Sequence, residues 1–433
     1  MKFKSILLIT ALCCFQWLQA QETRTLTLQE AINLSLKNSH QLKSKDAKVL
    51  AATVAVKEAQ EKKLPDASIS GSYLYLPAKP TIDLKSGSAN AGSPSVKQAI
   101  YGTANISLPL YSGGKINYGI KSAQFLEQAE KLDAENDRET ITFNIINACI
   151  NLYKANQAIE LVKENLNQSQ QRVKDLSNLE KNGLLARNDL LKAELQSSNI
   201  ELVLLDAESN YKIACVNMNI MMGLPEQTIL IPDKSGLSLP TTTKTVDEYE
   251  QDAVQNRKDI SAISFRKKSA DINLKSIKAD KYPSLALTGG YIAADIPNFL
   301  TVYNAVNIGV GVKYNIASLW KNKSRVQQAA AGITQISAAQ NMLTDNIRLQ
   351  VNQAYLSYEV SKKKIEVYEK AVQQATENYR ITKNKFDNSL ATTTELLDAD
   401  VALLQSRLSV TNAKADSFVA YNKLLQITGT LKY

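Results

Sequence analysis

The chain has a single histidine, His40, among its 433 residues, which leaves little for acid–base or metal chemistry. No cysteine pair or acidic cluster accompanies it. The sequence also contains no glycine-rich phosphate loop, no set of residues with metal-ligand spacing and no nucleophile elbow. Such a residue is ordinarily a surface histidine or one whose hydrogen bonds are satisfied within the fold. We therefore do not expect an enzyme, a resident metal or a cofactor.

A basic stripe is also lacking. Lys and Arg number 51 against 42 Asp and Glu. Removing the two lysines of the leader predicted below leaves 49 against 42, a net charge of +7 (49 − 42). The lysines are scattered among acids, whereas a nucleic-acid groove needs clustered cations and interleaved aromatics. The charges predict a solvated surface and no nucleic-acid partner.

Long apolar runs are absent after the first 20 residues. Lys2 and Lys4 precede an apolar stretch over 6–18, and Ala20 supplies a small residue at the cut. This pattern predicts a secretory signal peptide over 1–20, too short to span a membrane as a helix. Leu12 before Cys13 disfavours lipid attachment. An exported chain without a later apolar helix is soluble or crosses an outer membrane as β-strands.

Of the four cysteines, two lie in the predicted signal peptide, which leaves Cys149 and Cys215. Both lie in helical patterns. Because exported chains of this size rarely need disulfides for stability, we expect two buried, reduced thiols.

The chain repeats itself at a nearly fixed offset. Residues 25–30 align with 243–248, an offset of 218 (243 − 25), and further on the offset becomes 206 (388 − 182). Such a period is far longer than the roughly 20–50 residues of a solenoid. The alignment predicts a first repeat over 21–223, a short irregular linker over 224–242 and a second repeat over 243–433. Matching pairs are Pro65 with Pro283, Gly71 with Gly289, Asn182 with Asn388, and Gly223 with Gly429.

Four segments alternate apolar or small residues with polar ones, which is the period of a β-strand. Each is about ten residues long, the length that a tilted strand needs to cross a bilayer. Lys313 and Asn315 share a face that must stay wet. This favours membrane strands over two ordinary hairpins on a soluble core. The segments are 68–75, 100–110, 284–291 and 306–316.

The 12 extra residues of the first repeat (218 − 206) fall between its two strands. Residues 78–98 are rich in Gly, Ser, Pro and Asn and lack periodicity, so they predict an exposed loop. The counterpart around 295–298 is short. Unequal loops suit an outward-facing surface, where we expect residues 86–94 to lie.

Most of the remaining sequence predicts long helices, from about Asn117 to Asn182 and from Asn188 to Met222 in the first repeat. In the first of these, apolar and small residues are spaced 4-3-4-3, the period of a left-handed coiled coil. The second repeat copies the spacing. These two seams are Ile141, Ile145, Ala148, Leu152, Ala155, Ile159, Val162 and Leu166, and Ile347, Val351, Ala354, Tyr358, Ser361, Ile365, Tyr368 and Val372.

Four strands cannot close a barrel, since the smallest barrels hold roughly eight. An open edge in lipid leaves backbone groups unpaired at several kcal/mol each. Membrane strands in this chain therefore require several copies to close together. The charged helices must then project into water, so the expected fold is mostly α, with an α-barrel of coiled helices and a shared β-barrel.

Several segments in a fixed order carry a family resemblance, which covers the chain from Gln21 to Tyr433. The segments are 28–32 (LQEAI), Leu64-Pro65, 107–115 (SLPLYSGGK), 182–184 (NGL) and 189–191 (DLL). With these segments in this order, the chain resembles the TolC family of trimeric outer-membrane efflux channels.

The resemblance implies a homotrimer whose four strands per chain close a twelve-stranded β-barrel in outer-membrane lipid. Its helices form a periplasmic tunnel, and the tunnel tip docks a periplasmic adaptor and, through it, an inner-membrane pump. The implied role is passive conduction in a tripartite efflux or type I secretion system.

The resemblance also places Glu395 and Asp398 at the periplasmic constriction, with Asp189 at the matching position of the first repeat. Spacing of i, i+3 puts both second-repeat acids on one helix face. In a trimer they would form two carboxylate rings able to attract cations. The alternative is a solvated face whose N-terminal acids are favoured by the helix dipole.

Family members hold this entrance shut with a tyrosine before the second turn and an arginine within it. This chain has Phe386 and Ala391 at those positions. Arg187 in the other turn is a candidate substitute.

A periplasmic or surface coiled-coil scaffold, with the strands in a soluble sandwich, is the main alternative. A porin is disfavoured because porins build a barrel from one chain and lack long helices. The cargo cannot be named from the sequence.

Overall fold

The computed structural model describes residues 23–78, 96–233, 244–297 and 299–432. The predicted signal peptide, nearly all of the predicted outward loop and the end of the predicted linker lie outside these ranges. The chain divides into two compact units. The first comprises Met1–Asp46, Asp133–Ile260 and Leu343–Tyr433, and the second comprises Ala47–Leu132 and Ser261–Met342. Each unit therefore contains residues from both predicted repeats.

Helices and strands follow the same order in the two halves of the chain: two helices, two long strands and a helical hairpin. The first half contains β1 (Thr23–Leu26), α2 (Leu28–Asn38), α3 (His40–Glu61), β2 (Asp66–Tyr75), β3 (Gln98–Tyr111), α4 (Lys115–Lys181), α5 (Arg187–Met222) and β4 (Ile229–Pro232). The second contains α6 (Val246–Asn256), α7 (Lys258–Lys278), η2 (Ala279–Lys281), β5 (Ser284–Ile296), β6 (Leu300–Lys313), α8 (Ser318–Asp387) and α9 (Thr393–Ile427).

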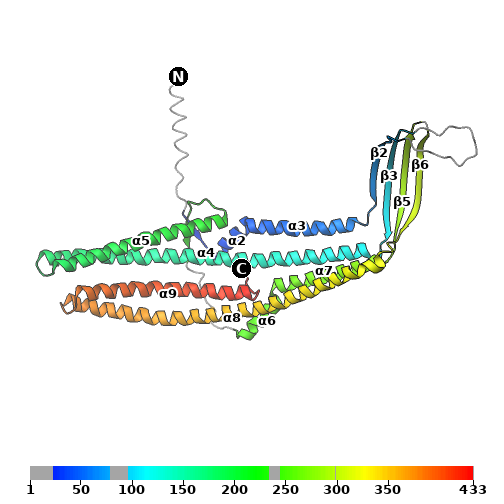
Figure 1. Ribbon diagram of the computed structural model, residues 1–433. Helices are drawn as coiled ribbons and strands as arrows, with labels where there is room; N and C mark the ends of the chain where they lie inside the picture. The colour runs from blue at the N-terminus through cyan, green and yellow to red at the C-terminus, as the bar shows by residue number, and fades with distance from the viewer. Residues whose placement is uncertain (1–22, 79–95, 234–243, 298, 433) are drawn as a thin grey trace, which may run out of the picture. The chain divides into compact units, whose positions relative to one another are not determined.

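The second unit contains a four-stranded antiparallel sheet in the order β2-β3-β5-β6 (Figure 1). Residues paired directly across strands point to the same face. The pairs Ile69–Ala104, Leu108–Leu287, and Leu287–Val310 therefore place the apolar residues of all four strands together. The opposite face carries Ser, Thr, Asn and Gly, including a Ser70–Thr103 hydroxyl hydrogen bond of 2.8 Å.

The apolar face of this sheet is exposed in the single chain. Ile69 is 89% exposed and Ile308 is 81% exposed. This exposure differs from a soluble sandwich, where the apolar faces would cover each other.

All four predicted strands are confirmed, but their ends differ from prediction. β5 continues five residues past residue 291, and β6 begins six residues before Val306. A bulge interrupts the alternation of apolar and polar residues in these added stretches, so the sequence pattern did not reveal them. The register shifts between Ile292 and Ala294, and Asn304 has a φ of 60°. β6 also ends at Lys313 rather than at residue 316, since a turn begins at Asn315, whose carbonyl accepts from the Ser318 N–H at 3.0 Å.

A glycine pair connects β3 to α4. Gly113 and Gly114 have φ values of 62° and 82°, which favour glycine. A Cβ on Gly113 would meet the Ala279 carbonyl oxygen at 3.0 Å. The small residue therefore lets the start of α4 lie against η2.

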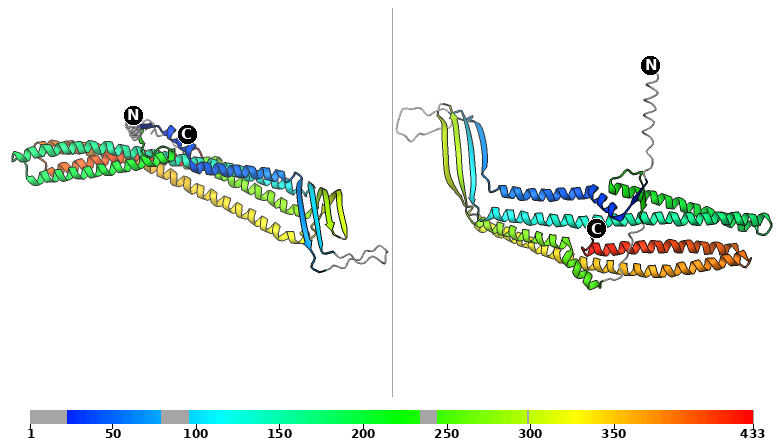
Figure 2. Two further views of the ribbon diagram at one scale, coloured as in Figure 1. Left: turned by 90° about the horizontal axis from the view of Figure 1, so that it is seen from above. Right: turned by 180° about the vertical axis from the view of Figure 1, so that it is seen from behind.

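The first unit contains the hairpins that α5 forms with the later part of α4, from Asp133, and that α9 forms with the later part of α8, from Leu343 (Figure 2). The predicted seams are confirmed along most of their length, with Ile145, Leu152, Val351 and Tyr358 at most 1% exposed. Towards the turn of the second hairpin the seam is only half-buried, at Ile365, Tyr368 and Val372. Among the described residues, no helix is both long enough and apolar enough to span a membrane.

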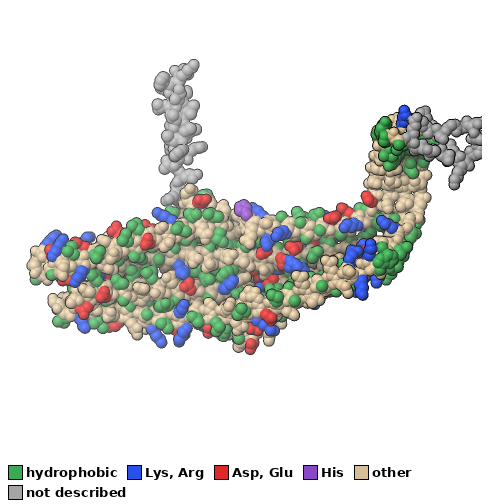
Figure 3. Space-filling view, viewed as in Figure 1, with side chains coloured by type: hydrophobic (Ala, Val, Ile, Leu, Met, Phe, Trp, Pro, Cys, Tyr) green, Lys and Arg blue, Asp and Glu red, His purple; other side chains and the backbone are tan. Residues whose placement is uncertain are grey.

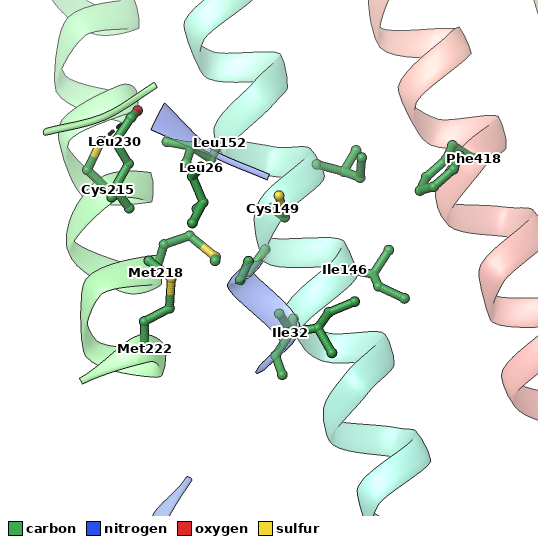
Figure 4. Close-up of a cluster of buried hydrophobic side chains, with 14 of the residues drawn as sticks. Leu26, Ile32, Ile146, Cys149, Leu152, Cys215, Met218, Met222, Leu230 and Phe418 are labelled. Atoms are coloured by element: carbon green, nitrogen blue, oxygen red, sulfur yellow. Dashed lines mark hydrogen bonds between the residues drawn. The ribbon is translucent and has the colours of Figure 1, made fainter. Parts of the chain in front are cut away.

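The main hydrophobic core of this unit lies between α4, α5, α9 and the short elements β1, α2 and β4 (Figure 4). Met218 of α5 points towards α2 and α4 there, Leu230 lies beside Cys215, and Ile146 on the other side of α4 points towards Phe418 of α9. The core also contains Cys149 and Cys215, which are free and buried as predicted. Burial raises the pKa of the Cys149 thiol to about 11.

The prediction of an irregular linker is wrong for Ile229–Pro232. This segment is β4, which pairs in parallel with β1. A four-residue strand whose partner lies about 200 residues away gives no local periodicity, so the sequence pattern could not reveal it.

Candidate functional site

The two hairpin turns of the first unit have equivalent backbone geometry. Gly183 has a φ of 72°, and its counterpart Ser389 has a φ of 61°. In each turn the next N–H donates back to the last helical turn, from Leu184 to the Leu179 carbonyl at 2.9 Å and from Leu390 to the Lys385 carbonyl at 2.7 Å. Ser389 is in the left-handed region that favours glycine. Both turns present the first residues of a helix, α5 and α9, at the tip.

Glu395 forms a capping box at the start of α9. Its carboxylate accepts from the Thr392 N–H at 2.7 Å and from the Thr392 hydroxyl at 2.9 Å, and its own N–H donates to that hydroxyl at 3.2 Å. These bonds hold the pKa of Glu395 below its usual range. The residue is exposed, so the same carboxylate both caps the helix and meets solvent.

Asp189 occupies the matching position of α5 but behaves differently. The N-cap residue there is Ala186, which has no side-chain donor or acceptor, so no capping box forms. The Asp189 carboxylate instead accepts from Lys192 Nζ at 3.1 Å. Lys192 also donates to the Thr394 hydroxyl at 3.4 Å, and this bond joins the first turn region to the second.

The other predicted site residues lie around these turns. Asp398 is exposed one turn beyond Glu395, and Ala391 is half-buried in the second turn. Arg187 lies 3.9 Å from Glu180 within its own hairpin. The structure thus places all the predicted acids at the hairpin tips, while their role in a constriction stays a prediction.

Phe386 joins the two hairpins through apolar contact. It packs against Leu176, Leu190 and Ala193 of the first hairpin. A phenylalanine has no hydroxyl, so this link is made by burial of the ring and not by a hydrogen bond.

A buried polar network that sequence reasoning missed lies further from the tip. Asp400, on α9, is 1% exposed and accepts from Arg172 Nη1 at 3.1 Å. Asn165 Nδ2 lies 3.3 Å from both Asp400 oxygens, and Arg172 Nη2 donates to the Tyr379 hydroxyl at 3.1 Å. The network connects α4, α8 and α9.

The sequence did contain a signal for this network. Along α9, the buried residues Leu396, Asp400 and Leu403 follow the 4-3 spacing of a seam. A charged residue at an apolar seam position requires a partner, because an unpaired buried charge is costly. The 4-3 spacing along α9 therefore predicts Asp400 as a buried charge that needs a partner.

Comparison with known proteins identifies the class. Residues 31–224 and 250–430 match the model of the family described as outer membrane efflux protein. The chain belongs to this family, which confirms the resemblance stated from the sequence.

Individual relatives are distant in sequence and similar in fold. The chain is 22% identical over 344 residues to the outer membrane efflux protein BepC of Brucella suis, covering 78% of this chain and 74% of BepC. It is 24% identical over 259 residues to the outer membrane protein TolC of Vibrio cholerae, covering 58% of each. The crystal structure of the outer membrane protein VceC from Vibrio cholerae superposes with a TM-score of 0.74 at 19% identity, covering 93% of this chain and 96% of VceC.

Proposed function

We propose that this protein is a channel that conducts exported molecules across the outer membrane. Three copies close a twelve-stranded β-barrel in the lipid, and their long helices form a tunnel in the periplasm. The channel has no energy source of its own. A periplasmic adaptor docks the tunnel tip and connects it to an inner-membrane pump.

The observation that carries this proposal is the exposed, register-aligned apolar face of the sheet. β2 and β6 each have only one strand neighbour among the described residues, so the sheet has two edges. Its strands alternate in direction, so β6 of one copy can pair antiparallel with β2 of the next. Three copies of four strands give a ring of twelve without an edge, which lipid requires.

At the entrance, Glu395 and Asp398 of three chains would line the narrowest point. Six carboxylates in a narrow lumen would attract cations. The Phe386 packing and the Lys192–Thr394 bond would hold the two hairpins of each chain together when the entrance is closed. Arg187 and Ala391 would lie in the turns around this entrance, and Asp189 would belong to the same constriction.

A soluble coiled-coil scaffold is disfavoured by the same sheet. A face of Ile, Val, Leu and Tyr with this much exposure would cause aggregation in water unless another surface covered it.

Conductance tests the proposal. Purified mature protein added to a planar lipid bilayer should produce discrete, uniform steps of current. A mild salt wash that releases the protein from membranes, together with absence of current steps, would contradict the proposal and support the scaffold.

A further inference from the structure

A basic cavity lies within the second unit, where the strands meet the helices. Its volume is about 470 Å³, and four cations and one carboxylate in its lining give a net charge of +3 (4 − 1). These charged residues are Lys115, Asp280, Lys313, Lys321 and Arg325. Figure 3 shows Lys and Arg side chains gathered near this end of the sheet.

The strands contribute their polar face to this cavity. Ser284 and Lys313 both line it and are paired directly across β5 and β6, so their side chains lie on the same face of the sheet. The neighbouring pair, Leu285 with Val312, lies on the opposite, apolar face. A ligand of the cavity therefore approaches from the side away from lipid, which in the proposed barrel is the lumen.

One part of the lining is a fixed frame. The Asp280 carboxylate is paired with both Lys115 and Arg325, and its side chain is only 11% exposed. The distance from Arg325 Nη1 to Asp280 Oδ2 is 2.6 Å. The frame ties the start of α4 and the first turns of α8 to η2.

The other two cations, Lys313 and Lys321, are not neutralised. Among the described residues neither makes an ion pair, and both are exposed in the cavity lining. The side-chain amide of Asn315 is also exposed there and makes no hydrogen bond within the described part of the chain, so its N–H groups are available to a ligand. Two ammonium groups and an amide, without a competing carboxylate, are donors that suit an oxyanion.

The cavity has room for more than a single ion. Its volume falls within the range of small-molecule pockets, about 300–1,000 Å³. Tyr282 lines it and is 61% exposed, and Ala279 and Ala317 add apolar surface. An aromatic group attached to the oxyanion would therefore find a ring to pack against.

We propose that this cavity binds small organic anions in which a phosphate or carboxylate is joined to an aromatic body. The oxyanion contacts Lys313, Lys321 and the Asn315 amide, the aromatic body packs on Tyr282, and the frame around Asp280 holds the cavity in shape. In the proposed trimer, three such cavities surround the lumen where strands give way to helices, and anionic cargo binds there in transit. The position in the lumen rests on the proposed function, while anion binding by the chain does not.

Isothermal titration calorimetry on the protein purified in mild detergent tests the proposal. The probes are phenyl phosphate, inorganic phosphate and the cation phenyltrimethylammonium. The cavity variant is Lys313→Gln with Lys321→Gln, which leaves the frame intact, and the ring variant is Tyr282→Leu. The matched control is Lys323→Gln with Lys364→Gln, which removes two exposed lysines of α8 that do not line the cavity.

Phenyl phosphate should bind the wild type and the control equally, and the cavity variant about ten-fold more weakly, because two charge-assisted contacts are lost. Tyr282→Leu should weaken phenyl phosphate by about three-fold and leave inorganic phosphate unchanged, because only the ring contact is lost. Phenyltrimethylammonium should not bind. Equal binding of phenyl phosphate to the wild type, the control and the cavity variant would overturn the proposal.

Two further outcomes separate the parts of the proposal. Inorganic phosphate that binds the wild type as tightly as phenyl phosphate would overturn the organic class of ligand. Light scattering on the same samples tests the proposed function independently. A water-soluble monomer that still binds phenyl phosphate would defeat the channel and the lumenal position but support the site, whereas a trimer that does not bind phenyl phosphate would overturn the site alone.

Discussion

Arg172 on α4 and Asp400 on α9 form a buried ion pair that joins the two helical hairpins, with 3.1 Å between Nη1 and Oδ2. The Arg172 side chain is 10% exposed. Asn165 and Tyr379 supply the remaining hydrogen bonds, so both charges are satisfied away from water. A network of this kind fixes how the two hairpins lie against each other, because no other register would pair the charges.

Removing one partner of this buried ion pair should destabilise the folded protein. Asp400→Ala leaves the Arg172 guanidinium buried without its carboxylate, and we expect a loss of about 3–5 kcal/mol in the free energy of unfolding. The exposed Asp398→Ala, two residues away, should change it by less than about 0.5 kcal/mol. Denaturant titration followed by helical circular dichroism measures both. Equal effects of the two variants would mean that the pair contributes little.

The Glu395 side chain both caps α9 and carries a negative charge, and substitution by glutamine removes only the charge. Glutamine keeps an oxygen that can accept from the Thr392 N–H, so Glu395→Gln should preserve the capping box. Combined with Asp398→Asn, it removes both proposed carboxylate rings. We expect the double variant to keep the wild-type helix content and oligomeric state but to lose block by divalent or trivalent cations in bilayer recordings. Unchanged block would place the constriction elsewhere, with Asp189 as the next candidate.

The cap of α9 should also depend on pH. Because hydrogen bonds from Thr392 lower the pKa of Glu395 in the folded protein, the contribution of this carboxylate is complete above the unfolded pKa. It is lost as pH falls through the lowered folded pKa, below roughly pH 4. The protection of the Thr392 and Glu395 amides, taken as the exchange rate relative to the intrinsic rate at each pH, should fall in that range. Glu395→Gln should remove this pH dependence, and a wild type without it would contradict the capping role.

Phe386 should help to keep the entrance closed. Phe386→Ala removes a half-buried ring from its contacts with the first hairpin and should weaken that link by about 1–2 kcal/mol. We expect a higher single-channel conductance from the periplasmic side. Leu390→Ala is the matched control, since Leu390 is 77% exposed in the neighbouring turn. Equal conductance of the two variants would remove Phe386 from the gate.

The native thiols should be unreactive in the folded protein. Burial raises the pKa of Cys149 to about 11, and burial also raises the pKa of Cys215 despite its contacts with Leu230 and Tyr211. Since the thiolate is the reactive form, a colourless disulfide reagent that releases a dye should react slowly at pH 8 and rapidly after unfolding. Rapid reaction of the folded protein would show that this core opens readily.

Much of the fold followed from periodicity. The seam at Ile145 and Leu152 has the period of a coiled coil, and the alternation at Val310 and Val312 has the period of a strand, so both were predicted from local sequence. The β1–β4 pairing and the bulge at Asn304 could not be predicted in this way, because they depend on distant partners or interrupt the period. The positions of Glu395, Asp398 and Asp189 at the tips followed from the family resemblance. The capping box at Glu395 and the buried Asp400 required the packing of specific helices.

The central claim is that three chains close one barrel through the edges formed by β2 and β6. The most direct test is the mass of the mature protein extracted in mild detergent, measured by light scattering with the detergent contribution subtracted. Three copies in one stable particle is the predicted result. A monomer or a dimer would contradict the account, because four or eight strands of this kind cannot form the twelve-stranded pore.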